Sequence, residues 1–598
     1  MKEQWILKNV PGDYKTVGET LGIDPLIVKI LYNRKLTEPD QIEKYLHGTL
    51  NACHSPYLLK DAESAAKYIL AAIQSGECIS IATDYDTDGV MSSFILKQGI
   101  EYLGGKAKIY APDRVGEGYG LNRRIVDMVA EVGSRFLITC DNGIAAMDGV
   151  SYAKSLGITV VVTDHHEVQY EERNGEKQYL YPEADAIVNP KQPDCPYPWK
   201  EICGAVVVCK LLQVLFDLAG ENPETCQQWL PFVAIATVTD VMLLQDENRI
   251  IVKEGLERMK SCGNLGLQAL LFQTDLTDKP IDSYHIGFVI GPCFNAAGRL
   301  STMEEALALL ESPDAAQAKE RAERLKHIND VRKDMTEQGV ELALGKLRGR
   351  KGKLDKILVL YLEEIHESLA GIIAGRIKER YHRPVLVFTD AEGEAEDGGK
   401  QIKGSGRSIE KYNMFQEILG CKELLSRFGG HPMAAGVTMP YENLAEFGKR
   451  LNENTTLSEE DFIPVVTIDS KLPLKYISEG LVEDLRLLEP FGNGNAKPQF
   501  AGQHYKVSGG RIFGKNRNVL KLQVDDGTKR LDAMLFGVEE ICQFQDFIEE
   551  NFGRGELDRM FQGRAENIDI GLVFYPSINE YMGVKTPQIV IRHYCRIQ

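Results

Sequence analysis

The sequence predicts an α/β protein built on a doubly wound parallel sheet. Between residues 79 and 163, short β-branched apolar runs alternate with helical stretches, which is the pattern of strands buried on both faces and joined by crossover helices. Polar residues rich in aspartate and histidine follow these runs directly. A chain of 598 residues is also too long for one core, so we expect several domains.

The elements follow in order along the chain. Residues 1–50 are expected to form a helical appendage, and residues 51–310 the first α/β domain. Its predicted strands and helices alternate as follows: strands at 79–82, 107–110, 136–139 and 159–163, and helices at 91–103, 122–132 and 147–156.

Three further segments complete the prediction. A helical pattern from Glu304 to about Leu347 is thick with charge, and such a helix is most often a solvated spacer, so residues 311–347 are assigned as a connecting helix. Residues 348–456 form a second α/β domain. Residues 457–598 contain short alternating strands with Gly/Asn turns, which indicates a small β-barrel.

Composition indicates a soluble, reduced protein. Hydrophobic residues make up 43% and charged residues 26%. No stretch approaches the roughly 20 apolar residues that span a bilayer, and residues 1–5 lack the features of a secretion signal, so we expect a cytoplasmic protein without a membrane partner. The 12 cysteines contain no CxxC pair, which disfavours a zinc ribbon or a disulfide framework.

The net charge of −18 argues against a protein that coats duplex DNA through bulk electrostatics. It does not exclude a nucleic-acid enzyme. Clustered carboxylates at a metal site would account for part of the charge, and a local basic groove can coexist with an acidic exterior.

Four apolar runs lead into groups that could hold a metal. We expect strands to end before Asp84, Asp141, His165 and Asp240, the last after the run from Val233 to Val238. The carboxyl ends of parallel strands lie along one edge of a sheet, so the four groups are expected to converge on one crevice.

The chemistry of these groups suits a hard cation. Asp84, Asp86 and Asp88 alternate, which puts three carboxylates on one side of an extended segment, and Gly89 allows a sharp turn. Such oxygens with one imidazole suit Mn²⁺ or Mg²⁺, and two cations about 4 Å apart would clamp a phosphodiester. Taken singly, each cluster is more often a helix cap or a surface turn. Four coincidences favour a phosphodiesterase centre.

These residues resemble a known family. Asp84-Tyr85-Asp86-Thr87-Asp88-Gly89, Cys140-Asp141-Asn142-Gly143, Asp164-His165-His166 and Thr239-Asp240-Val241 match, in order, the motifs of the DHH phosphoesterase superfamily. Further segments resemble its RecJ family of single-strand-specific exonucleases from about residue 50 onward: Glu117-Gly118-Tyr119-Gly120-Leu121, Val188-Asn189-Pro190, Gly291-Pro292, Asn295-Ala296-Ala297-Gly298-Arg299, Gly404-Ser405-Gly406-Arg407-Ser408 and Gly429-Gly430-His431.

The resemblance implies a role for each site residue. The metal ligands would be Asp84, Asp86, Asp88, Asp141, His165 and Asp240, with Asp141 as the bridge. The catalytic set would be Asp84, Asp141, His165 and His166, where His166 orients the scissile phosphate. The substrate-binding set would be Arg114, Arg299, Arg376, Ser405, Arg407, Gly430 and His431. In the C-terminal barrel, which resembles an oligonucleotide-binding (OB) fold, Phe513, Lys515 and Arg517 would hold single strands, and Lys521 and Tyr575 are further candidates.

Three positions depart from the family pattern. Ala82-Thr83 stands where relatives have His-Gly, Cys293 stands in place of an arginine, and Ile365 in place of a tryptophan. The first change is expected to alter metal affinity or preference, and the second to alter phosphate contacts.

The resemblance implies a metal-dependent 5′-to-3′ exonuclease that hydrolyses single-stranded DNA to mononucleotides in repair and recombination. Single-strand-binding protein and a repair helicase are the implied protein partners. Two alternatives are considered: a DHH phosphodiesterase of short oligonucleotides or cyclic dinucleotides, and a catalytically inactive DNA-binding scaffold. The barrel disfavours the first, whereas Ala82 and Cys293 keep the second open.

Overall fold

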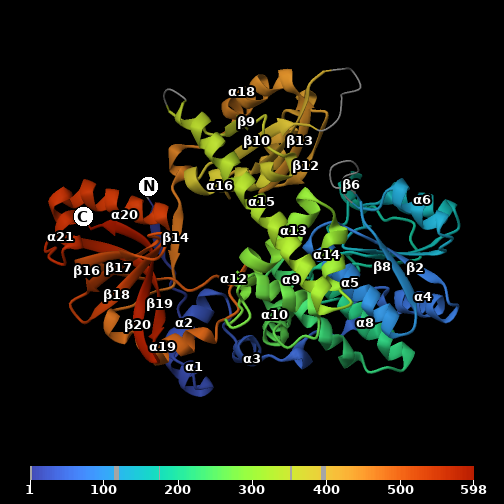
Figure 1. Cartoon of the computed structure of the whole chain (residues 1–598), viewed down its shortest axis with the longest axis horizontal. Coiled ribbons are helices and arrows are strands. Elements are labelled where there is room, and N and C mark those ends of the chain that lie inside the picture. The colour runs from blue at the N-terminus through green and yellow to red at the C-terminus, as the bar shows by residue number, and fades with distance from the viewer. Residues whose placement is uncertain (1–2, 113–119, 174, 350–352, 392–398, 598) are drawn as a thin grey trace. The chain divides into compact units, whose positions relative to one another are not determined.

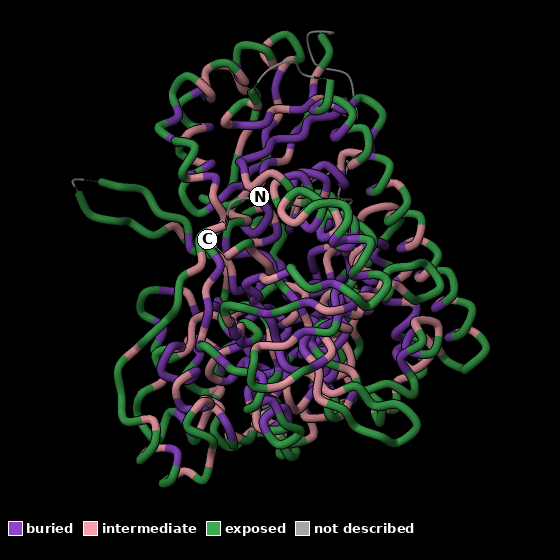
Figure 2. The backbone as a smooth tube through the Cα atoms, turned by 90° about the vertical axis from the view of Figure 1, so that its left-hand side faces the viewer, coloured by how far each residue is buried: buried purple, intermediate pink, exposed green. Residues whose placement is uncertain are grey.

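The computed structural model describes residues 3–112, 120–173, 175–349, 353–391 and 399–597. The chain forms two compact units (Figure 1): one is Cys53–Pro464, and the other combines Met1–Ala52 with Val465–Gln598. Among the described residues, no helix combines the length and the apolar character needed to cross a bilayer. Figure 2 shows buried residues concentrated in the interior and exposed residues along the outer loops.

The first sheet confirms the predicted doubly wound fold. Its five strands are all parallel, in the order β3-β2-β4-β5-β8. Chain order therefore reverses between β2 and β4, and in open α/β sheets ligands bind at such a switch point, beyond the carboxyl ends of the strands. The strands are β2 (Cys78–Thr83), β3 (Lys106–Tyr110), β4 (Phe136–Cys140), β5 (Thr159–Thr163) and β8 (Ala186–Val188).

Helices cover both faces of this sheet, as Figure 1 shows on its blue and green side. One face carries α4 (Ala62–Gln74), α5 (Thr87–Tyr102) and α8 (Gly204–Ala219), and the other α6 (Arg123–Glu131) and α7 (Met147–Ser155). A hairpin of β6 (Tyr170–Arg173) and β7 (Glu176–Tyr179) leaves the sheet after β5.

The prediction of a strand at 233–238 is wrong. These residues lie in α9 (Leu230–Thr239), which is followed by α10 (Asp246–Arg258). Leu230 to Thr237 is buried throughout against α5, α8 and α10. A helix buried on every side shows no amphipathic period, so a short apolar run of this kind cannot be told from a buried strand by its pattern.

The predicted connecting helix is present as α15, but it is not a free spacer, because one side of it is buried. The segment from Glu304 breaks into two helices, and the longer one, α15, packs against α11, α13, α14 and α16 through buried residues such as Ala322 and Leu325. These helices are α11 (Leu265–Gln273), α12 (Ser283–His285), α13 (Gly291–Leu300), α14 (Met303–Leu310) and α15 (Ala315–Arg348); a π-helical turn, η4 (Ile286–Ile290), joins α12 to α13.

A second sheet follows in the same unit, in the order β12-β13-β11-β10-β9. Only the pair β9–β10 is parallel. Helices α15 and α16 cover one face and α17 and α18 the other. The bounds are β9 (Leu358–Tyr361), α16 (Ala370–Tyr381), β10 (Val385–Asp390), β11 (Gln401–Arg407), α17 (Met414–Leu419), β12 (Arg427–His431), β13 (Ala434–Pro440) and α18 (Leu444–Asn454).

The other unit contains the predicted barrel. Its strands follow the order β16-β17-β18-β20-β19, and pairing of β16 with β19 closes it. The elements are β15 (Ser470–Lys471), α19 (Glu479–Arg486), β16 (Phe500–Phe513), β17 (Val519–Asp525), β18 (Arg530–Phe536), α20 (Val538–Phe552), α21 (Arg554–Phe561), β19 (Asp569–Tyr581) and β20 (Val584–Arg596).

The N-terminal segment belongs to this barrel unit. Strand β1 (Gln4–Leu7) pairs in parallel with β14 (Val465–Ile468). Ile27, Ile30 and Leu31 are buried in the same hydrophobic core as the barrel strands. The helices of this segment are α1 (Tyr14–Leu21), α2 (Pro25–Asn33) and α3 (Pro39–His47).

Candidate metal centre

The first acidic loop begins where β2 ends. Asp84 is buried directly after the strand, and Asp86 is the N-cap of α5, where its Oδ1 accepts hydrogen bonds from the backbone N–H of Asp88 (2.9 Å) and Gly89 (3.1 Å). A Cβ on Gly89 would lie 2.3 Å from the carbonyl oxygen of Asp84. Only glycine therefore allows this tight turn from strand to helix.

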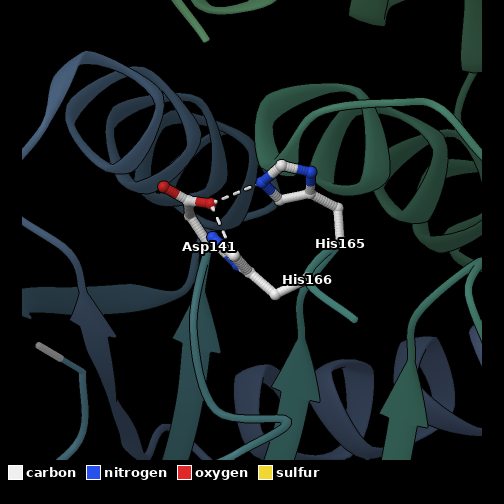
Figure 3. Close-up of side chains that lie close together, drawn as sticks. All are labelled: Asp141, His165 and His166. Atoms are coloured by element: carbon white, nitrogen blue, oxygen red, sulfur yellow. Dashed lines mark ion pairs between the residues drawn. The ribbon is translucent and has the colours of Figure 1, made fainter. Parts of the chain in front are cut away.

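Asp141 and the two histidines follow the next strands of the sheet. Asp141 comes directly after β4 in the left-handed region (φ 59°), which aspartate tolerates better than most residues. His165 follows β5, and its Nε2 lies 3.0 Å from Oδ1 of Asp141. Figure 3 shows Asp141 and both imidazoles turned toward one another from neighbouring strand ends. Nδ1 of His166 is 3.9 Å from the same oxygen.

Asp88 and Asp240 complete the cluster. Each has its Oδ2 3.6 Å from Nε2 of His165. The carboxylate of Asp88 accepts hydrogen bonds from the backbone N–H groups of Gly204 (2.6 Å) and Ala205 (2.8 Å), at the N-terminus of α8. Asp240 caps the C-terminus of α9, so a helix rather than the predicted strand presents it.

The potential ligand atoms form three overlapping groups within the described part of the chain. One contains Asp84, Asp86 and Asp141, another Asp88, His165 and Asp240, and a third Asp141, His165 and His166; in each, the atoms lie within 4.8 Å of one another. The six predicted metal ligands are thus brought together at the switch point of the sheet. Asp141 is shared by two of the groups.

The electrostatics of the cluster favour a bound cation. Burial, with repulsion from neighbouring carboxylates, raises the pKa of Asp88 to about 7 and that of Asp240 to about 8, and raises that of Asp141 as well. Burial lowers the pKa of His165 to about 3, so the ring is neutral. Its Nε2 faces three carboxylates and has no hydrogen-bond partner among the described residues. Oxygen ligands with one imidazole fit Mn²⁺ or Mg²⁺.

His166 has a different environment. Burial alone would lower its pKa, but the hydrogen bond from Nδ1 to Oδ1 of Asp164 (2.7 Å) raises it to about 9. A protonated ring has no lone pair for a metal ion, although the distance of 3.9 Å between Nδ1 and Oδ1 of Asp141 would allow one to lie between them. The role that the resemblance implies for His166, orienting the scissile phosphate, stays a prediction.

Asp164 was missing from the predicted site. It is buried, and its carboxylate also accepts hydrogen bonds from the backbone N–H groups of His165, His166 and Ile144. Burial alone would raise the pKa of Asp164, but the hydrogen bond and the charge of the His166 ring, together with His165 and the Ile144 N–H, hold it below its usual value. A carboxylate beside a ligand histidine commonly orients it, and this was the available signal. Gly204 was also missed, and its distance of 116 residues from Asp88 left no local signal.

Three family models match the chain. They are the DHH family N-terminal domain over residues 78–237, the DHHA1 domain over 354–456 and the RecJ OB domain over 468–593. The single-stranded-DNA-specific exonuclease RecJ of Bacillus subtilis is 33% identical over 594 residues, covering 99% of this chain and 70% of that protein. The Escherichia coli protein of the same name is 30% identical over 614 residues and 99% of both chains. The chain belongs to the RecJ family.

Solved structures of RecJ proteins share this fold. RecJ of Thermus thermophilus with Mn²⁺ matches with a TM-score of 0.79 and 24% identity, over 100% of this chain and 80% of that one. An exonuclease RecJ bound to manganese matches with a TM-score of 0.56 and 30% identity, over 67% and 96%. The mixed α/β class and the OB-type barrel of the RecJ family are thus confirmed here.

The motif Asn295–Arg299 joins the metal centre to the second α/β domain. Oδ1 of Asn295 accepts from the backbone N–H of Thr87 (3.1 Å), and a Cβ on Gly298 would lie 2.3 Å from the carbonyl oxygen of Tyr85. The guanidinium of Arg299 donates to the carbonyl oxygen of Ser368 (2.8 Å).

Ser405 and Arg407 lie at the N-terminus of α16. A Cβ on Gly371 would lie 2.8 Å from Oγ of Ser405 and from a guanidinium nitrogen of Arg407. Arg407 donates to Ser405 Oγ (3.2 Å), and burial lowers its pKa. This pair is therefore placed together beside a helix N-terminus, which favours an anion.

The remaining predicted substrate residues that the structure describes lie on neighbouring elements of the second domain. Arg407 of β11 lies opposite Ala434 of β13, and Ala434 lies opposite His431 of β12, so His431 is two strands from Arg407 at the same level of the sheet. Arg376 is exposed on α16, and Gly430 and His431 are exposed in β12. Gly430 has φ 151°, and a Cβ there would lie 2.3 Å from the carbonyl oxygen of Ala434. Arg114 lies outside the described residues.

In the barrel, the predicted strand-binding residues lie at the end of β16. Phe513 is 40% exposed, and Lys515 and Arg517 are exposed in the turn that follows. Tyr575 is only 6% exposed and carries Lys497 over its ring at 3.9 Å, so it cannot stack on bases as expected. Lys521 pairs with Asp532 at 2.5 Å.

The departures from the RecJ-family pattern have structural explanations. Ala82 is fully buried in β2 and presents no ligand to the centre. Cys293 is buried between α13 and α15, where it donates to the carbonyl oxygen of Val289 (3.2 Å) and accepts from Asn329 (3.5 Å). Its thiol thus takes part in the packing of α13 on α15, and the expected change in phosphate contacts stays a prediction. Ile365 is buried against α16.

Proposed function

We propose that the chain is a metal-dependent exonuclease that hydrolyses single-stranded DNA to mononucleotides, from the 5′ end. The observation that carries this proposal is the shared cluster of six acidic and imidazole ligands at the switch point of the sheet. Relatives named as single-stranded-DNA-specific exonucleases match across 99% of the chain and support the substrate.

Two divalent cations, Mn²⁺ or Mg²⁺, fit the cluster best. Asp84, Asp86 and Asp141 would hold one, and Asp88, His165 and Asp240 the other, with Asp141 between them. When bound, such a pair activates water and stabilises the leaving oxygen of a phosphodiester. The absence of an imidazole at Ala82 leaves one cation with carboxylate ligands only, so we expect it to bind the more weakly of the two.

The chain's own residues then position the substrate. The protonated ring of His166, 43% exposed, donates a hydrogen bond to the scissile phosphate while Asp164 fixes its orientation. The backbone N–H groups of Gly204 and Ala205 hold Asp88 in place before any cation arrives. The ligand geometry is therefore largely set by the fold.

A chain of contacts supports the proposed direction of digestion. The metal-binding loop at Tyr85 touches Gly298, Arg299 binds Ser368, and Gly371 lies against Ser405 and Arg407. A terminal phosphate held by Arg407 and the N-terminus of α16 would place the first phosphodiester near the cations. This arrangement supports a 5′-phosphate end as the starting point.

The test is digestion of single strands labelled at either end, with and without Mn²⁺. We expect labelled mononucleotide to appear first from the 5′ label, only with the cation, and faster with a 5′-phosphate than with a 5′-hydroxyl. Release that begins at the 3′ label would contradict the polarity. Binding without release would favour the inactive scaffold, and faster cleavage of dinucleotides than of long strands would favour the small-substrate phosphodiesterase.

A further inference from the structure

Two aromatic side chains stand exposed on the segment before α13. Tyr284 in α12 is 60% exposed and Phe288 in the π turn η4 is 65% exposed. Their rings stack with centroids 4.8 Å apart and planes 27° from parallel. Their spacing of four residues puts them on one side of the helical segment. Together they form an apolar, planar surface, which we call the aromatic pair.

This segment packs directly against the metal centre. A Cβ on Gly291 would lie 2.1 Å from Cγ2 of Thr239, and one on Gly287 would lie 3.7 Å from Val238. The carbonyl oxygen of Gly291 also accepts from Oγ1 of Thr87 (3.4 Å). The segment therefore lies over the last turn of α9, next to Asp240, and against the start of α5.

The aromatic pair lies on the solvent side of that segment. Ile286 and Ile290 are fully buried and face the protein, so the row containing Tyr284 and Phe288 faces outward. Among the carboxylates that contact His165, Asp240 is the most exposed (27%), and it directly follows the last turn of α9. The segment that carries the pair therefore lies beside the most exposed carboxylate of the centre.

The backbone of the segment is unusual. Gly291 N–H bonds to the carbonyl oxygen of Ile286, a π-helical hydrogen bond between α12 and α13. Such turns are rare and occur mostly at functional sites. Two large aromatic rings in water are also unfavourable unless something covers them for part of the functional cycle.

We propose that Tyr284 and Phe288 stack on the bases of the single strand as it enters the metal centre. The ligand class is the nucleobase of any sequence, because every base has a π face and the pair offers no hydrogen-bond code. This inference rests on the proposed exonuclease function. It also gives a reason for preferring single strands, since bases within a duplex already stack on each other and cannot stack on the pair.

The experiment is a double-mutant cycle in which the two rings are removed from the protein and two bases are removed from the DNA, separately and together. The variant Tyr284→Ala/Phe288→Ala is compared with the wild type on a 5′-phosphorylated oligonucleotide, intact or with two consecutive abasic positions near the 5′ end. We expect the variant to raise KM for the intact strand about 10-fold or more, since stacking is worth roughly 5- to 150-fold per base, with kcat little changed. The abasic strand should show the same loss with the wild type and no further loss with the variant.

Two controls separate stacking from structural damage. Phe272→Ala removes a ring of equal exposure (65%) from α11, which packs on α14 and α15, and should leave KM unchanged. Phe288→Trp keeps a planar ring and should retain wild-type KM. The inference would be overturned if the double alanine variant had an unchanged KM. It would also be overturned if the increase in KM from removing the rings multiplied the increase from removing the bases. In either case, digestion by the wild type would leave the exonuclease assignment intact. If the wild type releases no nucleotide, the exonuclease assignment fails first and the inference falls with it.

Discussion

The carboxylates of the metal centre repel one another until a cation lies among them. Asp88, Asp141 and Asp240 are drawn together by the fold, and desolvation raises the pKa of each. Residues that bind no metal offset part of this cost, because Gly204 and Ala205 direct two backbone N–H groups at Asp88. The carboxylate side chains that form the site therefore lower the stability of the metal-free protein.

The pH dependence of the metal-free protein follows from these shifts. The pKa of Asp88 is about 7 in the folded state against 3.8 for the ordinary group, so ionisation costs free energy only in the fold. The protonated Asp88 side chain therefore contributes fully to the free energy of unfolding below pH 3.8, and this contribution is lost as the pH rises through about 7. In chelator, we expect the melting temperature to fall between pH 5 and pH 8, and Asp88→Asn to weaken that fall, because asparagine does not ionise.

Thermal melts at several pH values, with chelator and with excess Mn²⁺, check this prediction. Mn²⁺ should reverse the trend, because its ligands must be deprotonated. Parallel pH profiles for the wild type and Asp88→Asn in chelator would show that Asp88 is not the source.

A second residue-scale prediction concerns Gly204. A Cβ there would lie 2.9 Å from Cβ of Asp141 and 3.1 Å from Oδ2 of Asp88. Gly204→Ala should displace these ligands and weaken Mn²⁺ binding about 10- to 100-fold, as loss of supporting contacts around a metal commonly does. Titration calorimetry measures the affinity directly.

Gly345→Ala is the matched control. Gly345 lies exposed in α15, and a Cβ added there would meet nothing within 4 Å. This substitution should leave Mn²⁺ affinity unchanged and raise stability by about 0.5–1 kcal/mol, because alanine restricts the unfolded helix segment more than glycine. Equal Mn²⁺ affinity in the two variants would show that close packing at Gly204 is unimportant.

The sequence predicted which acidic and imidazole side chains lie together, because they belong to recognisable motifs at strand ends. Asp84 and Asp141 come directly after β2 and β4, His165 is the second residue after β5, and the parallel sheet brings these strand ends together. The support from Gly204 could not be predicted, since it joins residues 116 apart through a backbone N–H that carries no side-chain signal. Local patterns therefore located the ligands but not what holds them.

At the scale of elements, a buried ion pair joins two helices that lie next to the metal centre, α8 and α10. Lys210 of α8 and Glu247 of α10 lie 2.9 Å apart and are almost fully buried. Glu247 also accepts hydrogen bonds from Tyr197 Oη and from the backbone N–H of His54 (3.2 Å). Since α8 holds Asp88 and α10 follows Asp240, this network sets the spacing of the two carboxylates.

Glu247→Gln should destabilise the Cys53–Pro464 unit by about 3–5 kcal/mol, because it leaves the buried Lys210 ammonium without a counter-charge. Glu63→Gln makes the same change in an exposed pair with Lys67 and should cost under about 0.5 kcal/mol. Denaturant unfolding monitored in this unit measures both. Combining Glu247→Leu with Lys210→Met should recover part of the loss; a double variant less stable than Glu247→Gln would contradict this explanation.

Sequence patterns misjudged the elements whose burial depends on distant parts of the chain. Helix α9 lacks a polar face, so its apolar run matched a strand, and α15 carries enough charge on its outer face to suggest a free spacer. Strands β2, β4 and β5 were placed correctly because each is bounded by turn residues and followed by a periodic helix. Contacts with distant parts of the chain decide the secondary structure of such ambiguous segments, and a short stretch of sequence carries no information about those contacts.

At the scale of the whole molecule, the two ends of the chain fold together. The barrel was predicted to begin near residue 457, and nothing local indicated that residues 1–52 share its core. In the structure, β1 pairs with β14, and the side-chain amide of Asn33 donates to the carbonyl oxygen of Asp469 (3.0 Å). The catalytic unit is thus inserted between two halves of another folding unit.

Deletion of residues 1–52 should therefore unfold the barrel and leave the catalytic unit folded. Ile27, Val28, Ile30 and Leu31 are fully buried in the barrel core, and burying each such side chain stabilises by about 1.5–3 kcal/mol. Their sum is comparable to the whole stability of a typical domain. Limited proteolysis should then cut the barrel rapidly while a fragment spanning Cys53–Pro464 persists, and Mn²⁺ should still protect that fragment from heat.

Leu31→Ala in the full chain should weaken the same core without unfolding it completely, and should lower the free energy of unfolding of the barrel unit by about 2–5 kcal/mol. A barrel that resists protease without residues 1–52 would show that the N-terminal helices only cover a core that is already complete.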